Sequence, residues 1–181
     1  MIFPKALAPP GPGRADTHRM LFAATALSVS AVDQTGKAWA VRSWRGVPGQ
    51  GPLRAELVRN AGAAFGLGQQ WTVVISLITV AALAVLVWAG LRARGRGRVL
   101  VLALMAGGAA GNGADRLLRA PGALHGAVVD WIKVPGYGPV FNLADVALRA
   151  GALLAVLLLL RGHRHGTTTA LPVPAPPAAR R

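Results

Sequence analysis

The segment at residues 71–91 contains no charged residue, and this constrains the chain more than any other feature. About 20 apolar residues in a helix rise about 30 Å, which is the thickness of the hydrocarbon core of a bilayer. Trp71 and Trp88 stand near its two ends, where tryptophan anchors a helix in the membrane interface. The segment therefore predicts a transmembrane helix.

Three further apolar stretches have a similar length, at residues 20–41, 99–118 and 139–160. The chain is 53% hydrophobic and 14% charged, whereas about a quarter of the residues of a soluble domain are charged. A segment exposed to lipid must satisfy its own backbone hydrogen bonds, which favours helices. We therefore predict an all-α membrane protein with four transmembrane helices.

The charge distribution predicts the orientation of these helices. Four arginines crowd the short loop at residues 92–98, and short basic loops stay in the cytoplasm. Both termini then lie in the cytoplasm, and residues 42–70 and 119–138 lie outside. The net charge of +14 could also indicate nucleic-acid binding, but its position beside apolar spans favours the topological explanation.

The ends of the chain differ in composition from the part between them. Residues 1–18 and 162–181 are rich in proline, glycine, alanine and basic residues, which predicts disordered cytoplasmic tails. Residues 19–161 then form one transmembrane domain. The sequence Ser28-Val29-Ser30-Ala31 could end a cleavable signal peptide instead. The apolar character resumes beyond Asp33, which argues against that alternative.

One outer segment carries a weak strand signal. Leu53, Ala55 and Leu57 alternate with Arg54 and Glu56, after several turn-forming glycines and prolines. We expect a small sheet on the outer surface of the membrane.

The acidic residues are few, and most of them lie in or beside apolar spans. The six are Asp16, Asp33, Glu56, Asp115, Asp130 and Asp145. An ionisable side chain inside a membrane is costly, so it is a functional candidate by default. With the topology above, polar residues of four separate segments converge on one layer near the outer surface. They are Asp33, Lys37, Asn60, Asn112, Asp115, Arg116, Asp130, Asn142 and Asp145.

Asp130 and Asp145 are the best candidates for a catalytic pair. The chain has no cysteine, and three of its four histidines lie in the tails, so we expect neither a thiol nucleophile nor a metal site. Two close carboxyl groups share a proton, and such a pair can activate water. The spacing of the two residues is a weak signal, because a structural ion pair such as Asp115 with Arg116 would also explain buried acids.

Five sequence blocks resemble those of the lipoprotein signal peptidases (signal peptidase II). They follow the order of that family and cover residues 20–161. The blocks are Asp-Gln-Thr-Gly-Lys at 33–37, Asn-Ala-Gly-Ala-Ala-Phe-Gly at 60–66, Gly-Asn-Gly-Ala-Asp-Arg at 111–116, Gly-Ala-Val-Val-Asp-Trp at 126–131 and Pro-Val-Phe-Asn-Leu-Ala-Asp at 139–145.

The resemblance implies a membrane aspartic endopeptidase of the bacterial cytoplasmic membrane. It implies cleavage of prolipoproteins just before the diacylglyceryl-modified cysteine, without a cofactor, by a chain that we expect to be monomeric and in contact with membrane lipid. It also implies a small extracytoplasmic β-cradle and a short surface helix. Asp130 and Asp145 match the catalytic aspartates. Supporting or substrate-binding roles are implied for Asp33, Lys37, Asn60, Asn112, Asp115, Arg116 and Asn142.

Two features depart from the family pattern. The stretch from Arg116 to Gly126 is longer than in typical members, and the insert around Pro121 would fall in the surface helix. Arg149 shares a helix face with Asp145, four residues earlier, and would favour its ionised form if the two were close. We expect Arg149 to turn toward another partner.

Three other functions were weighed. A proton-relay transporter would place polar residues at several depths, and the inner halves of the spans have almost none. An inactive lipoprotein-binding relative would not need both aspartates. Other membrane aspartic peptidases are disfavoured because the sequence has no Gly-x-Gly-Asp block.

Overall fold

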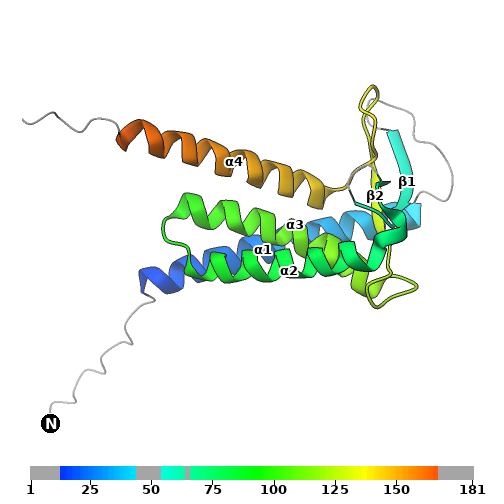
Figure 1. Cartoon of the computed structure of the whole chain (residues 1–181), viewed down its shortest axis with the longest axis horizontal. Coiled ribbons are helices and arrows are strands. Elements are labelled where there is room, and N and C mark those ends of the chain that lie inside the picture. The colour runs from blue at the N-terminus through cyan, green and yellow to red at the C-terminus, as the bar shows by residue number, and fades with distance from the viewer. Residues whose placement is uncertain (1–12, 44–53, 64–65, 167–181) are drawn as a thin grey trace, which may run out of the picture.

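The computed structural model describes residues 13–43, 54–63 and 66–166. Four long helices run alongside one another, with a small sheet at one end (Figure 1). The helices are α1 (Arg14–Ser43), α2 (Thr72–Arg92), α3 (Arg96–Leu118) and α4 (Leu143–Gly166). A short 3-10 helix, η2 (Gln69–Trp71), leads into α2. The protein is therefore mostly helical, as the apolar stretches predict.

The sheet has two antiparallel strands, β1 (Arg54–Asn60) and β2 (Val128–Lys133). Val58 pairs with Asp130 and Asn60 with Val128, and the register is interrupted between Ala55 and Val58. The alternating pattern before Asn60 correctly predicts β1. Residues 128–133 lie within a segment for which the sequence predicts only an outer connection, so β2 was not predicted.

Helix α3 lies against α1, α2 and α4, and its small residues allow the close approach. A Cβ atom on Gly107 would lie 2.6 Å from the carbonyl oxygen of Ala26 on α1. One on Gly108 would lie 2.6 Å from the carbonyl oxygen of Ala144 on α4. The glycine- and alanine-rich part of α3 is thus a packing surface, since any larger side chain would push the neighbouring helices away.

Large apolar side chains cover the outside of α2 and α4. Ile78 and Val85 on α2 are each 63% exposed, and Leu153 and Leu159 on α4 are 61% and 66% exposed. Among the described residues, two segments are long and apolar enough to cross a membrane, Gln69–Arg92 and Leu143–Arg161. Such faces require an apolar environment, which a bilayer supplies.

Three boundaries differ from the predicted ones. Helix α1 begins at Arg14, within the segment predicted as a disordered tail, and α4 continues to Gly166. The fourth helix begins at Leu143 rather than Pro139, because Phe141 first makes a bridge with Ile132 beside the sheet. Asp145 consequently lies in the first turn of α4.

The insert around Pro121 forms turns and no helix. The backbone N–H of Gly122 donates to the carbonyl of Arg119, and that of His125 donates to the carbonyl of Gly122. The placement of the insert in a surface helix is therefore wrong. The short helix that the structure describes at this end of the molecule is η2.

Candidate active site

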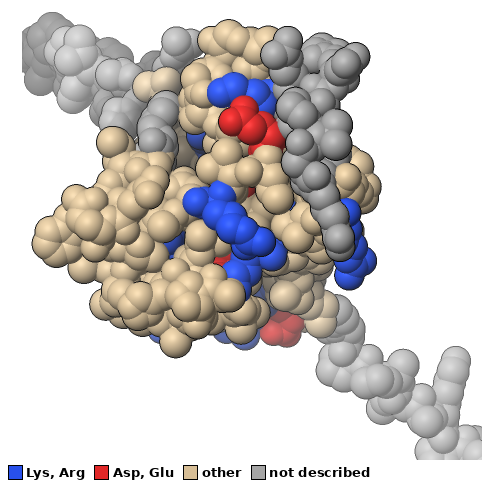
Figure 2. Space-filling model, turned by 90° about the vertical axis from the view of Figure 1, so that its right-hand side faces the viewer, with Lys and Arg blue, Asp and Glu red and all other residues tan. Residues whose placement is uncertain are grey.

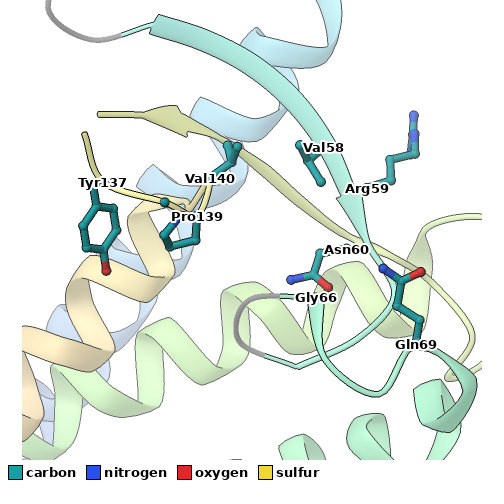
Figure 3. A pocket seen from close by; sticks show the side chains of 9 residues that line it. Val58, Arg59, Asn60, Gly66, Gln69, Tyr137, Pro139 and Val140 are labelled. Carbon is teal, nitrogen blue, oxygen red and sulfur yellow. The ribbon is translucent and has the colours of Figure 1, made fainter. Parts of the chain in front are cut away.

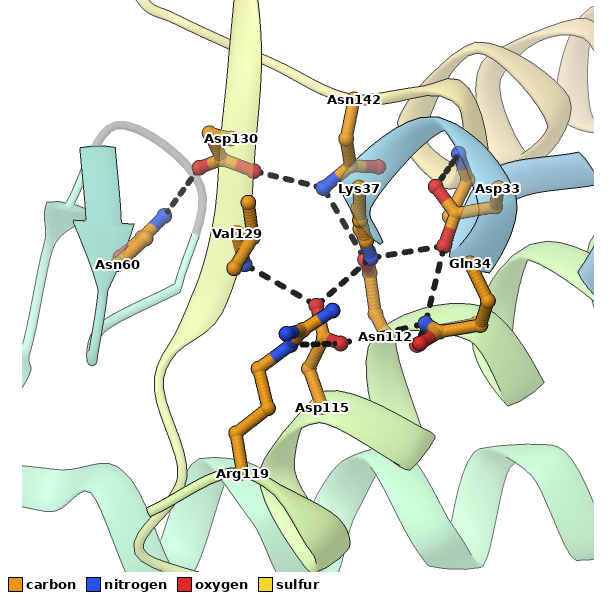
Figure 4. Close-up of polar contacts among 12 residues, drawn as sticks. Asp33, Gln34, Lys37, Asn60, Asn112, Asp115, Arg119, Val129, Asp130 and Asn142 are labelled. Carbon is orange, nitrogen blue, oxygen red and sulfur yellow. Dashed lines mark hydrogen bonds and ion pairs between the residues drawn. The ribbon is translucent and has the colours of Figure 1, made fainter. Parts of the chain in front are cut away.

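A buried charge cluster joins α1 to α3. The ammonium group of Lys37 lies 2.8 Å from a carboxylate oxygen of Asp33 and 2.9 Å from one of Asp115 (Figure 4). The side chains of Asp33 and Lys37 are fully buried, and Arg119 also pairs with Asp115. Two carboxylates and two cations thus balance one another, and only Arg119, whose side chain is 22% exposed, reaches the surface, so the cost of burying the other charges is offset.

The cluster also fixes the elements on either side of it. Asp115 accepts a hydrogen bond from the backbone N–H of Val129 in β2, at 3.0 Å. Asp33 accepts one from the backbone N–H of Ala144 in the first turn of α4, at 2.9 Å. A Cβ atom on Gly111 would clash with the Asp33 carboxylate, so this position must be a glycine. The cluster therefore holds the residues that directly precede Asp130 and Asp145.

Asn142 connects these two aspartates. Its side-chain amide nitrogen donates to Oδ1 of Asp130 at 2.6 Å, and its backbone N–H donates to Oδ2 of Asp145 at 3.3 Å. In return, its Oδ1 accepts the backbone N–H of Asp145 at 2.9 Å, as in an N-terminal helix cap. Asn142 is fully buried. One buried residue therefore positions both carboxyl groups, one through its side-chain amide and the other through its backbone N–H.

Asn112 links this pair to the charge cluster. Its Oδ1 accepts from the Lys37 ammonium at 2.9 Å and from the Asn142 amide at 3.1 Å. Because Lys37 can only donate, the amide nitrogen of Asn112 must point the other way, and it donates to Oδ1 of Asp145 at 3.0 Å. Every polar atom of the Asn112 side chain thus has a defined role in orienting Asp145.

Burial, followed by the negative charge of Asp145, raises the pKa of Asp130 from 3.8 to about 6. Hydrogen bonds from Asn60, at 3.2 Å, and from Asn142 act in the opposite direction. Asp130 is only 4% exposed. It therefore holds a proton more readily than an ordinary aspartate, which is the property that a shared-proton pair requires.

Two pockets open at the sheet end of the molecule. One of about 420 Å³ is lined by Asp130, Asp145 and Asn112 together with apolar side chains of α2 and α3. A neighbouring pocket of about 560 Å³ lies between β1 and residues 137–140, with Asn60 on its wall (Figure 3). Seen from this end, basic side chains stand among mostly uncharged surface (Figure 2). A peptide could thus reach the aspartates from the outside of the helix bundle.

The structure brings eight of the nine predicted residues into one hydrogen-bonded network. These are Asp33, Lys37, Asn60, Asn112, Asp115, Asp130, Asn142 and Asp145. The ninth, Arg116, neither pairs with Asp115 nor contacts an aspartate of the pair by a hydrogen bond. It donates to the backbone carbonyls of Ala61 and Gly62, so it holds the turn that follows β1.

The sequence analysis assigned no role to two members of the network. Gln34 donates to the carbonyl of Gly111 at 2.8 Å and to Asp115 at 3.2 Å. Arg119 pairs with Asp115 four residues before it, a spacing that could have revealed the pair. Arg149, by contrast, behaves as expected. Its guanidinium lies 5.5 Å from the ring centre of Phe141 rather than in an ion pair with Asp145.

Comparison with known proteins agrees with the resemblance. The model of the signal peptidase (SPase) II family matches residues 25–161. The lipoprotein signal peptidase of Streptomyces coelicolor is 44% identical over 110 residues, which cover 61% of this chain and 53% of the relative. That of Mycobacterium tuberculosis strain H37Rv is 43% identical over 111 residues, 61% of this chain and 54% of the relative. The chain thus matches about half the length of these relatives.

Two solved structures, both described as bacterial membrane enzymes determined by the in meso method, have the same fold. The one at 2.3 Å resolution superposes with a TM-score of 0.72 and 27% identity, covering 83% of this chain and 93% of the other. The one at 1.9 Å gives a TM-score of 0.67 and 29% identity, covering 77% and 92%. With a family match that includes α2, α3, both strands and most of α1 and α4, the chain belongs to the signal peptidase II family.

Proposed function

We propose that this protein removes signal peptides from prolipoproteins, cleaving just before the diacylglyceryl-modified cysteine, with Asp130 and Asp145 as its catalytic pair. Membership of the signal peptidase II family supports the reaction. The observation that carries the assignment of the residues is that Asn142 donates to both carboxyl groups, to Asp130 through its side chain and to Asp145 through its backbone N–H, at the wall of one pocket. The described residues contain no group of His, Cys, Asp and Glu that could hold a metal ion.

The proposed topology has four transmembrane helices in the bacterial cytoplasmic membrane, with both termini in the cytoplasm. The arginine-rich turn between α2 and α3 lies at the end opposite the sheet (Figure 1), which supports a cytoplasmic turn and an external sheet. Residues 19–161 form the peptidase domain in this arrangement, and residues 1–18 and 162–181 flank it. The aspartates then lie near the outer face, where the modified cysteine of a membrane-inserted precursor would be.

In the proposed mechanism, the ionised Asp145 takes a proton from a water molecule as the water oxygen attacks the scissile carbonyl carbon. Asp130, with its raised pKa, donates its proton to the carbonyl oxygen. The tetrahedral intermediate then collapses and the C–N bond breaks. The leaving nitrogen receives the proton held by Asp145, and one hydroxyl of the intermediate returns its proton to Asp130 as the new carboxyl group forms. Asn112 and Asn142 keep the two carboxyl groups in place through both steps, and no cofactor takes part.

A direct test is to incubate the purified full-length chain with a diacylglyceryl-modified prolipoprotein and to identify the products by mass spectrometry. We expect one cut, immediately before the modified cysteine, and no cut in the same precursor without the lipid. A chain that binds the modified precursor and leaves it intact would instead be an inactive relative.

The role of Asn60 gives a further prediction. Asn60→Ala removes a hydrogen bond that favours the ionised form of Asp130, so the pKa of Asp130 should rise further. The alkaline limb of the pH–rate profile should move to higher pH by about half to one unit, the shift that corresponds to one hydrogen bond of about 1 kcal/mol. Gln69→Ala, which alters the neighbouring pocket, is the matched control. An alkaline limb unchanged in Asn60→Ala would show that Asp130 is not the group that titrates there.

A further inference from the structure

Arg149 is an exposed cation in the first two turns of α4, and the catalytic mechanism does not use it. Its guanidinium lies 5.5 Å from the ring centre of Phe141 and 6.0 Å from that of Tyr137. No acidic residue pairs with it among residues 13–43, 54–63 and 66–166. The aromatic rings therefore orient this charge without neutralising it.

Beside Arg149 lies an apolar groove of about 460 Å³ on the outside of the helix bundle. Val134, Tyr137 and Phe141 form the part of the groove nearest the sheet. Val146, Ala150 and Leu153 continue it along α4. Val146 is 44% exposed and Leu153 is 61% exposed, so the groove is open on the surface of the helix. The groove thus combines one cation, Arg149, with a strip of apolar side chains that runs along α4 away from the sheet.

The position of Arg149 along α4 determines which layer of the bilayer contacts this groove. Arg149 is six residues beyond Leu143, where α4 begins, so it lies about 9 Å along the helix. A long basic side chain at that depth extends toward the headgroups of the bilayer, and Tyr137 beside it is of the residue type enriched at the interface. In the proposed topology, a guanidinium at this level lies within reach of the lipid headgroups.

We propose that Arg149 and this groove bind an anionic phospholipid of the outer leaflet, with the phosphate on the guanidinium and an acyl chain along Val146, Ala150 and Leu153. The planar guanidinium donates two parallel hydrogen bonds to a phosphate, and the groove below offers only apolar contacts. A lipid satisfies both halves of the site, whereas a free phosphate satisfies only the first.

The position of this lipid would matter for the active site. Arg149 and Leu148 also line the pocket that contains Asp130 and Asp145, so the lipid would flank one side of that pocket. The lipid phosphate would also hold the guanidinium of Arg149 away from Asp145, which lies one helical turn nearer the start of α4. The proposal does not depend on peptidase activity, because lipid binding can be measured without cleavage.

The test is native mass spectrometry of the full-length chain in detergent, titrated with phosphatidylglycerol or phosphatidylcholine. We expect phosphatidylglycerol to bind more tightly to the unaltered chain, and Arg149→Met to weaken that binding about fivefold, as about 1 kcal/mol for one basic residue near an anionic surface implies. Arg42→Met, which removes an exposed cation at the end of α1, is the matched control and should bind as the unaltered chain does.

A second variant and a soluble ligand make the result decisive. Ala150→Trp fills the groove and leaves Arg149 in place, so it should also weaken the binding of phosphatidylglycerol. Glycerol phosphate, which has no acyl chain, should not compete with the lipid. Equal loss in Arg42→Met and Arg149→Met, or full competition by glycerol phosphate, would overturn the proposal. Size-exclusion profiles confirm that each variant is folded.

Discussion

Asp130→Asn and Asp145→Asn should each reduce cleavage of a lipid-modified precursor at least about a thousandfold, the upper range for the loss of a positioned acid or base. Asparagine has the shape of aspartate and can still contact Asn142, but it cannot take or hold the transferred proton. The measurement is the single-turnover rate of purified protein at a saturating precursor concentration. At saturation, the chemical step determines the rate.

Glu56→Gln is the control for these substitutions, because it removes one carboxylate from the exposed side of β1. Its rate should equal that of the unaltered chain. Each aspartate variant should retain the thermal midpoint of unfolding within a few degrees at acidic pH, where Asp130 is protonated in the unaltered chain. Cleavage by either variant at a rate near that of the control would place the chemistry elsewhere.

Lys37→Met should have the largest effect on stability, lowering the free energy of unfolding by about 3 to 5 kcal/mol. The ammonium group of Lys37 contacts Asp33, Asp115 and Asn112, and its side chain is fully closed to solvent. Its removal leaves the Asp33 carboxylate buried without a cation. We expect a much lower thermal midpoint in detergent and poor accumulation in membranes.

The double variant Asp33→Asn with Lys37→Met separates charge imbalance from lost packing. It leaves Asp115 paired with Arg119, so the buried region is again neutral and part of the stability should return. Lys133→Met removes a half-buried lysine at the end of β2 that lies outside the cluster, and it should have little effect. A midpoint for Lys37→Met as high as that of Lys133→Met would contradict a structural role for the cluster.

The residues of the charge cluster and of the aspartate pair could be predicted from the sequence, because charged residues are costly in apolar surroundings and therefore stand out there. Asp33, Lys37 and Asp115 stand out for this reason, and their depth along the predicted helices placed them in one layer. The sequence could not give their individual partners. Asp115 precedes Arg116 directly, yet neighbouring residues on a helix point in different directions, and Asp115 meets Arg119 and Lys37 instead.

The second strand could not be recognised by a local rule. Val128–Lys133 is short, and its burial comes from pairing with β1, which is distant in the sequence. The register places Val58 opposite Asp130, and Asp115 on α3 holds the backbone of the neighbouring Val129. The start of α4 was likewise set too early, because Phe141 bonds to the sheet before the helix can begin. Tertiary contacts decide both features.

The cap that Asp33 places on α4 has a consequence for biosynthesis. Asp33 belongs to α1, which leaves the ribosome before α4, and the Ala144 backbone N–H that it binds belongs to α4. A chain that has been made only as far as α3 already contains Asp33, Lys37 and Asp115, but it lacks both Asn142 and Asp145. The proposed peptidase would therefore stay inactive until α4 has been made, and it would become active only when α4 docks against α1.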